Sequence, residues 1–116
     1  MAIRRIDPSS YLSRAVLHGN TVYLAGLTAD DLSQDVAGQT RQILTKIDRY
    51  LNEAGTDKSK LLSAHIWLRD ISTFDEMNRV WVSWIDGGNP PARATVEARL
   101  AGDRYLVEIM VTAALD

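Results

Sequence analysis

The chain has 116 residues, of which 46% are hydrophobic, and a formal net charge of -2 at pH 7. This length and apolar content favour one hydrophobic core, so we predict a single domain spanning residues 1–116. The charge is spread along the chain without the basic stripe that binds nucleic acid, and the lack of cysteine excludes thiolate catalysis, disulfides and cysteine-based zinc sites.

The N-terminal segment, residues 1–8, contains no apolar stretch of signal-peptide length, and no later segment is long enough to span a membrane. We therefore expect a cytoplasmic protein with no membrane partner. The two histidines, His18 and His65, lie far apart and lack the spacing of metal ligands on a helix, so no metal site is expected.

The first predicted element is a β-hairpin. Apolar runs at residues 15–17 and 21–25 flank a Gly-Asn pair at 19–20, and both residue types tolerate the positive φ of a tight turn. An extra strand at residues 3–5 is compatible with the pattern. The polar stretch at 28–34 is expected to form a loop that could border a pocket.

Helical spacing of apolar residues occurs twice. Intervals of three and four residues predict an amphipathic helix that starts after Asp35 and ends at Gly55. Hydroxyl residues at 72–73, followed three residues later by carboxylates, predict a second helix whose first turn is capped reciprocally. The glycines at 87–88 and the prolines at 90–91 end this helix.

The remaining segments predict strands. Residues 61–68 are apolar at both parities, which is typical of a central strand. Strands at 92–100 and 105–114 are predicted to form a hairpin through the short connection 101–104. The order is β-hairpin, helix, strand, helix, β-hairpin, which favours an α+β fold with one mixed sheet and both helices on one face.

The sheet face without helices is expected to be apolar. In this arrangement it would expose part of the set Ile66, Leu68, Val96, Val107, Ile109 and Val111. Because such a surface exceeds what a monomer normally exposes, we expect self-association to cover it.

Arg93 is the most informative candidate for a binding residue. It follows two prolines at the start of a predicted strand, in the sequence NPPARATVE at 89–97. A guanidinium on a rigid backbone can bind a carboxylate through two parallel hydrogen bonds. The alternative is a surface arginine that pairs with a neighbouring acidic residue.

Glu108 lies within the apolar strand sequence LVEIMV, so its carboxylate is either solvated on an outward face or placed in a cleft, where desolvation would raise its pKa. In a hairpin, alternation puts Arg93 and Glu108 on one face but about 13 Å apart, too far to hold one small acid. A shared site would therefore combine residues of different subunits. Asn78, on the second helix, either contacts a ligand or is a solvated helix position.

Several segments together resemble the YjgF/RidA family of reactive-intermediate deaminases, over nearly the whole chain. The most specific is Pro91-Ala92-Arg93-Ala94-Thr95-Val96-Glu97, with the Glu108 strand at the spacing seen in the family. The weaker segments are Ser13 to Val16, Gly19-Asn20, the strand that ends at Gly26, Gln39 to Gln42, and Phe74 to Asn78.

The resemblance implies a chorismate-mutase-like subunit in a homotrimer, with a cleft between each pair of subunits. It also implies hydrolysis of enamine and imine acids, such as 2-aminoacrylate, to 2-keto acids and ammonia, without a cofactor or metal. Arg93 would bind the carboxylate of the small imino, enamino or keto acid, and Glu108 would position or activate the attacking water. An imine is already electrophilic, so orientation and proton transfer suffice.

The other substrate-binding positions that the resemblance implies are Tyr11, Leu12, Ala25, Gly26, Asn78 and Thr95. Thr95 stands where archetypal members have cysteine, and Ala25 where they have serine. Leu12 occupies the position of a tyrosine, which is displaced to Tyr11. These differences alter the pocket wall but keep the anchor, which indicates a divergent subgroup that retains the arginine.

Three alternatives stay open. The first is an endoribonuclease or translation-inhibiting role, which the net negative charge disfavours. The second is a non-catalytic trimer that binds small acids or acts as a chaperone, because a fold does not determine a function. The third is a pathway-specific enzyme for a larger imine or enamine acid.

Overall fold

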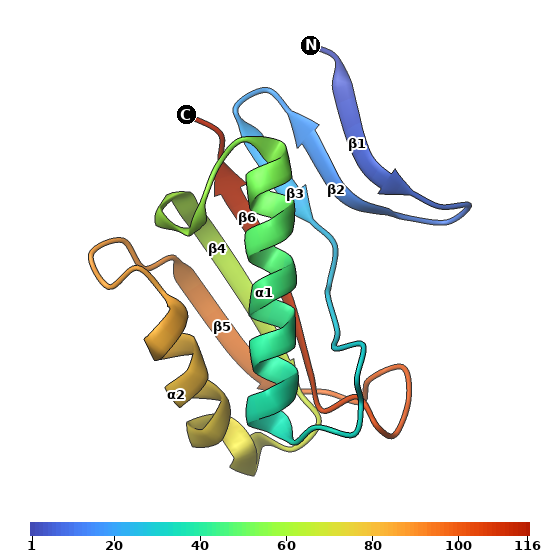
Figure 1. Ribbon diagram of the computed structural model, residues 1–116, viewed down its shortest axis with the longest axis vertical. Coiled ribbons are helices and arrows are strands. Elements are labelled where there is room, and N and C mark those ends of the chain that lie inside the picture. The colour runs from blue at the N-terminus through green and yellow to red at the C-terminus, as the bar shows by residue number, and fades with distance from the viewer.

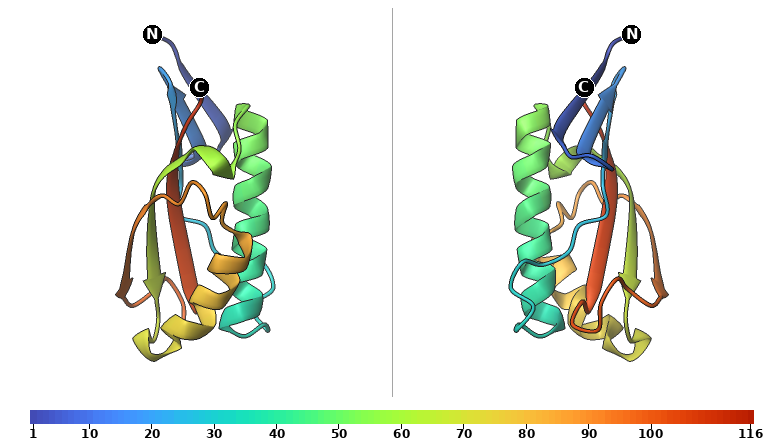
Figure 2. Two further views of the ribbon diagram at one scale, coloured as in Figure 1. Left: turned by 90° about the vertical axis from the view of Figure 1, so that its left-hand side faces the viewer. Right: turned by 90° about the vertical axis from the view of Figure 1, so that its right-hand side faces the viewer.

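The computed structural model describes residues 1–116 and contains one six-stranded sheet with two α-helices on one side of it (Figures 1 and 2). The strands are β1 (Ile3–Pro8), β2 (Ser13–His18), β3 (Thr21–Leu24), β4 (Leu61–Leu68), β5 (Ala92–Glu97) and β6 (Val107–Ala114). The helices are α1 (Val36–Ala54) and α2 (Phe74–Trp84). The short 3-10 helix η1 (Lys58–Lys60) lies between α1 and β4, and a second one, η2 (Ile71–Thr73), directly precedes α2. The predicted α+β class is confirmed, and neither helix has the length and apolar character needed to cross a membrane.

The predicted N-terminal hairpin is formed by β2 and β3. Ala15 pairs with Leu24, and the turn contains Gly19 at φ 61°, a conformation that glycine adopts without steric cost. The extra strand is also present and longer than expected, because β1 runs to Pro8 and pairs antiparallel with β2.

Helix α1 has the predicted ends and supplies much of the core. The carboxylate of Asp35 accepts a hydrogen bond from the amide of Gly38 at 2.9 Å, and Gly55 ends the helix in the left-handed conformation at φ 89°. The fully buried aliphatic side chains of α1, β4 and β6 that meet beneath the helix are Ile43, Leu44, Ile47, Leu51, Ile66, Leu68, Val107, Ile109 and Val111.

The predicted reciprocal cap at the start of α2 is wrong. The hydroxyl of Thr73 donates to the carbonyl of Asp70 at 2.6 Å and leaves the amides of α2 without a side-chain cap. The carboxylate of Glu76 instead accepts from the amide of Ala37 at 3.1 Å, in the first turn of α1. A carboxylate at the N-terminus of a helix stabilises its free backbone amides, so Glu76 of α2 links α2 to the first turn of α1.

The predicted pairing of the last two strands is also wrong. The strand order is β1-β2-β3-β6-β4-β5, so β4 lies between β5 and β6, parallel to β5 and antiparallel to β6. The largely buried β4 suits the centre of the sheet, whereas β5, with charged residues and two preceding prolines, suits an edge. Helix α2 forms the crossover between the parallel strands β4 and β5.

This order also changes which side chains face the helices. Some of a set of six apolar residues were expected on the open face. Five of them are buried under the helices, and only Val96 is exposed, at 50%. The open face instead carries Tyr23, which is 49% exposed, and the partly buried Trp67, whose ring stacks on that of His65 with centroids 6.1 Å apart. An apolar open face is therefore present, with a different composition.

Candidate functional site

The residues predicted to form the site lie in two groups. The first, which we call the arginine half-site, comprises Arg93, Thr95 and Asn78, on β5 and α2. The second, the glutamate half-site, comprises Glu108, Gly26, Ala25, Leu12 and Tyr11, on β6, the segment after β3 and the turn before β2.

The guanidinium of Arg93 is held by α2. Arg93 is in register with the buried Ala64 of β4, so its side chain extends on the helix side of the sheet. Its Nη1 donates a hydrogen bond to Oδ1 of Asn78 at 2.7 Å, and its Cζ lies 5.5 Å and 5.4 Å from the ring centroids of Phe74 and Trp81. A hydrogen bond and two aromatic neighbours together fix the position of the cation.

Arg93 has no acidic partner. The two ion pairs of the chain are Lys46–Asp30 and Arg69–Asp103, so the alternative of an arginine paired with an acidic residue is wrong. Burial lowers the pKa of Arg93, but an arginine side chain remains protonated in proteins. A partly desolvated cation held by neutral groups favours an anion such as a carboxylate as its ligand.

Thr95 adds an unused hydroxyl to the arginine half-site. Its Oγ1 is buried and makes no hydrogen bond. Thr95 lies two residues beyond Arg93 on β5, on the same side of the strand and about 7 Å along it. A buried hydroxyl without a partner destabilises the protein, so this group is free to bind a ligand atom next to the guanidinium.

In the glutamate half-site, the backbone of Gly26 lies close to the side chain of Glu108. Glu108 is in register with Trp67 and faces the open side of the sheet. A Cβ atom on Gly26 would collide with Oε2 of Glu108, so any other residue here would force the carboxylate to move from its observed position. Leu27 and Ile109 exchange two backbone hydrogen bonds of 2.8 Å and 3.1 Å, which hold the segment against β6.

Glu108 is partly buried, and this burial raises the pKa of its carboxyl group. The carboxylate is thus not fully solvated, and its place in a cleft stays a prediction. A carboxyl group with a raised pKa can both accept and release a proton closer to neutral pH than an ordinary glutamate.

Ala25 and the turn before β2 lie toward the same end of the sheet as Glu108, although no hydrogen bond joins Leu12 or Tyr11 to its carboxylate. The amide of Ala25 donates to the carbonyl of Arg14 at 2.9 Å, which places the start of β2 beside the end of β3. Because β6 runs antiparallel to β3, Glu108 at the start of β6 lies at this same end of the sheet. Leu12 is partly buried in the turn, whereas Tyr11 is 83% exposed and projects away from the chain.

One subunit does not bring the two half-sites together. Arg93 is in register with Ala64 and Glu108 with Trp67, three residues away on β4. This register and two strand spacings separate the two Cα atoms by about 14 Å. Their side chains extend on opposite faces of the sheet, so the prediction that they share a face is wrong. That different subunits supply them stays a prediction.

The two aromatic neighbours of Arg93 gave no signal in the sequence. Helical spacing indicated core positions for Phe74 and Trp81, and both rings also lie beside the cation of Arg93.

No group of three or more His, Asp or Glu side chains is arranged to hold a metal ion.

Comparison with known proteins agrees with the fold. Residues 2–115 match the family model described as endoribonuclease L-PSP. The chain is 41% identical over 114 residues to a RutC family protein of Haemophilus ducreyi, covering 98% of this chain and 97% of that protein. It is 40% identical over 115 residues to the RutC family protein YoaB of Escherichia coli, covering 99% and 100%. The crystal structure of NMB1025, a member of the YjgF protein family from Neisseria meningitidis, matches with a TM-score of 0.97 at 41% identity, covering 100% of this chain and 97% of that one. The chain belongs to the YjgF/RidA family and has its chorismate-mutase-like α+β fold.

Proposed function

We propose that this protein is an imine deaminase that hydrolyses 2-imino and enamino acids to 2-keto acids and ammonia. The observation that carries the proposal is the guanidinium of Arg93, which is fixed by Asn78 at 2.7 Å and has no acidic partner. A planar cation in this state is suited to bind the carboxylate of a 2-imino acid through two hydrogen bonds. The hydroxyl of Thr95 provides a further polar contact.

Glu108 would supply the proton transfers. Its carboxylate accepts a proton from water as the water oxygen bonds to the imine carbon, and the C=N electron pair moves to nitrogen. Glu108 returns this proton to nitrogen, which gives the neutral carbinolamine. The carboxylate then takes the proton of the carbinolamine hydroxyl group and passes it to nitrogen as the C–N bond breaks, so that ammonia leaves and the C–O bond becomes the keto group. The raised pKa of Glu108 suits a group that must take up and release protons in each cycle.

The site is proposed to lie between subunits of a homotrimer, each built as a single domain of residues 1–116. Arg93 and Glu108 extend on opposite faces of one sheet, so a cleft between two copies is the arrangement that lets both reach one small acid. The apolar open face, with Tyr23 and Val96 about half exposed, supplies a surface for that contact.

The preferred substrate is expected to carry an apolar side chain. Ala25 and Leu12 replace polar residues of archetypal members beside the glutamate half-site, and Thr95 replaces cysteine beside the arginine. A less polar wall favours a larger, apolar imino acid over 2-aminoacrylate. The chain would then belong to a divergent subgroup that retains the arginine.

The test is the rate of 2-keto acid formation from imines that an amino-acid oxidase generates in situ from several amino acids. Wild type and Arg41→Ala, which removes an exposed arginine of α1, should both accelerate hydrolysis. Arg93→Ala should abolish the acceleration. Absence of acceleration with every amino acid would reject the proposal. Binding of keto acids without turnover would then favour a small-acid-binding module.

Cleavage of RNA is the second candidate, because the matching family model is described as an endoribonuclease. The net charge of -2 disfavours it, since binding to a phosphate backbone depends on clustered basic residues. Cleavage of a single-stranded RNA by the purified protein, at a rate that Arg93→Ala leaves unchanged, would favour this candidate over the deaminase.

A further inference from the structure

A cavity of about 370 Å³ lies outside both half-sites, between α1, the loop after β3 and the start of β2. Arg14, Lys46, Arg49, Tyr50 and Tyr105 are among its lining residues. None of the residues of either half-site lines it. The polar loop at residues 28–34, which was expected to border a pocket, forms one wall.

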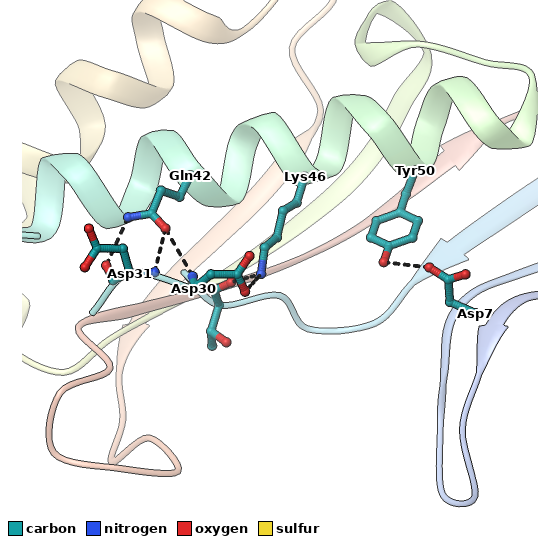
Figure 3. A network of polar contacts seen from close by, with 7 residues as sticks. Asp7, Asp30, Asp31, Gln42, Lys46 and Tyr50 are labelled. Atoms are coloured by element: carbon teal, nitrogen blue, oxygen red, sulfur yellow. Dashed lines mark hydrogen bonds and ion pairs between the residues drawn. The ribbon is translucent and has the colours of Figure 1, made fainter. Parts of the chain in front are cut away.

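The loop wall is fixed to α1 by hydrogen bonds (Figure 3). Oε1 of Gln42 accepts from the amides of Asp30 and Asp31 at 3.1 Å and 3.0 Å, and its Nε2 donates to the carbonyl of Asp31 at 3.0 Å. Nζ of Lys46 donates to the carbonyl of Thr28 and to Oδ1 of Asp30, both at 2.7 Å. The cavity is therefore preformed, and the charge of Lys46 is already neutralised.

The opposite wall is formed by the next turn of α1 and is tied to the β1–β2 hairpin. Figure 3 shows Tyr50 pointing toward Asp7, and the two side-chain oxygens are 3.0 Å apart in a hydrogen bond that Tyr50 donates. The guanidinium of Arg49 lies over the ring of Tyr50, with its Cζ 4.7 Å from the ring centroid. This contact limits the positions that the Arg49 cation can take.

Two arginines at the cavity form no ion pair. Neither Arg14 nor Arg49 takes part in the two ion pairs of the chain, although Glu53 and Asp7 lie near enough to Arg49 to stabilise its charge. Five of the ten lining residues are hydrophobic, but Leu27 is almost fully buried and the surface that the cavity exposes is mostly polar. The cavity thus combines two arginines with a polar lining in which Tyr105 supplies an aromatic ring.

We propose that this cavity is a binding site for a small organic dianion. Its anionic head, a phosphate monoester or a pair of carboxylates, would contact Arg14 and Arg49, and an aromatic body would pack against the ring of Tyr105. Arginine is suited to such a head because its planar donors match phosphate and carboxylate oxygens. This site does not depend on the proposed deaminase activity.

The cavity shares a wall with the glutamate half-site. Leu27 lines the cavity and exchanges two backbone hydrogen bonds with Ile109, while the adjacent Gly26 lies against the carboxylate of Glu108. A ligand bound here would therefore contact the far side of the segment that holds Glu108, without occupying the cleft.

The test uses phenyl phosphate at low ionic strength and about pH 8, where a phosphate monoester carries close to two negative charges. Binding to the full chain is measured by calorimetry and located by NMR shifts of backbone amides. Wild type should bind, with the largest shifts in residues 27–32. Arg14→Gln and Arg49→Gln should each weaken binding at least about tenfold, because each removes a charge-assisted contact. Both arginines are exposed, so the variants should keep the fold, which the NMR spectra check directly.

Arg41→Gln is the matched control, since it removes the same charge from a different side of α1, and Arg93→Ala tests the arginine half-site. Both should bind phenyl phosphate as wild type does. No binding by wild type, equal binding by all variants, or an equal loss in Arg41→Gln would overturn the proposal. A loss confined to Arg93→Ala would move the ligand to the arginine half-site. Inorganic phosphate should bind more weakly than phenyl phosphate, and equal affinity would refute the contact with the ring of Tyr105.

Discussion

Two inactive variants should restore imine hydrolysis when their subunits are mixed. Arg93→Ala removes the carboxylate anchor and Glu108→Gln removes the proton carrier, so each homogeneous oligomer should be inactive. The two residues lie about 14 Å apart by strand register and on opposite faces of one sheet. If each cleft takes the arginine from one subunit and the glutamate from its neighbour, a mixed oligomer contains clefts with both residues intact.

The size of the recovery follows from random assembly. In oligomers formed from equal amounts of the two variants, half of the subunits keep the arginine and the other half keep the glutamate. Each cleft draws independently on two subunits, so about one cleft in four is intact, and activity should return to about a quarter of the wild-type value. The ratio holds for any cyclic oligomer with one such cleft per interface.

The assay is keto acid formation after the variants are unfolded together and refolded, with mass spectrometry to show that mixed oligomers form. Wild type mixed equally with the Arg93→Ala, Glu108→Gln double variant is the control. Subunit exchange should lower its activity from about a half to about a quarter of wild type. Activity near zero in verified mixed oligomers of the single variants would refute a site shared between subunits.

Three further predictions concern individual side chains. Asn78→Asp places a carboxylate against Arg93 and neutralises it, so keto acid affinity should fall by about tenfold or more and further than in Asn78→Ala. Tryptophan fluorescence reports binding, because the ring of Trp81 lies 5.4 Å from the guanidinium, and wild-type affinity in Asn78→Asp would contradict the role of the free charge. Thr95→Val removes a buried hydroxyl without a partner, so it should raise the free energy of unfolding by about 1 kcal/mol while weakening acid binding. Thermal unfolding and titration test this, and a destabilised variant would speak against it. Burial raises the pKa of Glu108, so the folded state holds a proton that the unfolded state releases above about pH 4.3, and stability should fall with rising pH from there to the raised pKa. Glu108→Gln should lack this decline in urea unfolding, and parallel pH profiles for the two proteins would contradict the shift.

The elements that the sequence predicted correctly depend on local signals. Gly19 in the β2–β3 turn, the cap of Asp35 and the left-handed Gly55 act through their own backbone geometry, which neighbouring elements do not change. The hairpin and α1 therefore lie where the pattern placed them. The apolar run of β4 likewise indicated a central strand, and β4 does lie between β5 and β6, although only its helix side is covered within one subunit.

The pairing of β5 could not be predicted in this way. Alternation assigns side chains to two faces of a strand, but it does not say which strand lies beside it. A short connection at 101–104 favoured a hairpin, whereas the observed partner of β5 is β4, reached through the crossover helix α2. The error placed Arg93 and Glu108 on one face, although the conclusion that one subunit cannot combine them was unaffected.

Of the candidate site, the sequence indicated the residues but not their contacts. The hydrogen bond from Arg93 to Asn78 joins residues 15 positions apart and follows only from how α2 packs. The polar loop at 28–34 indicated a pocket, but Arg14 and Arg49 beside it gave no signal, because they come from a strand and a helix that meet only in the folded chain.

The contact between Gly26 and Glu108 provides a rule for comparing related sequences. A Cβ atom at position 26 and a glutamate at position 108 cannot occupy the observed arrangement together, so the two positions should vary as a pair. A relative with alanine or serine in place of Gly26 should carry at position 108 either a shorter side chain or one that points elsewhere. Such a sequence would keep the arginine half-site yet lose the geometry for proton transfer, which distinguishes binders from hydrolases before any protein is purified.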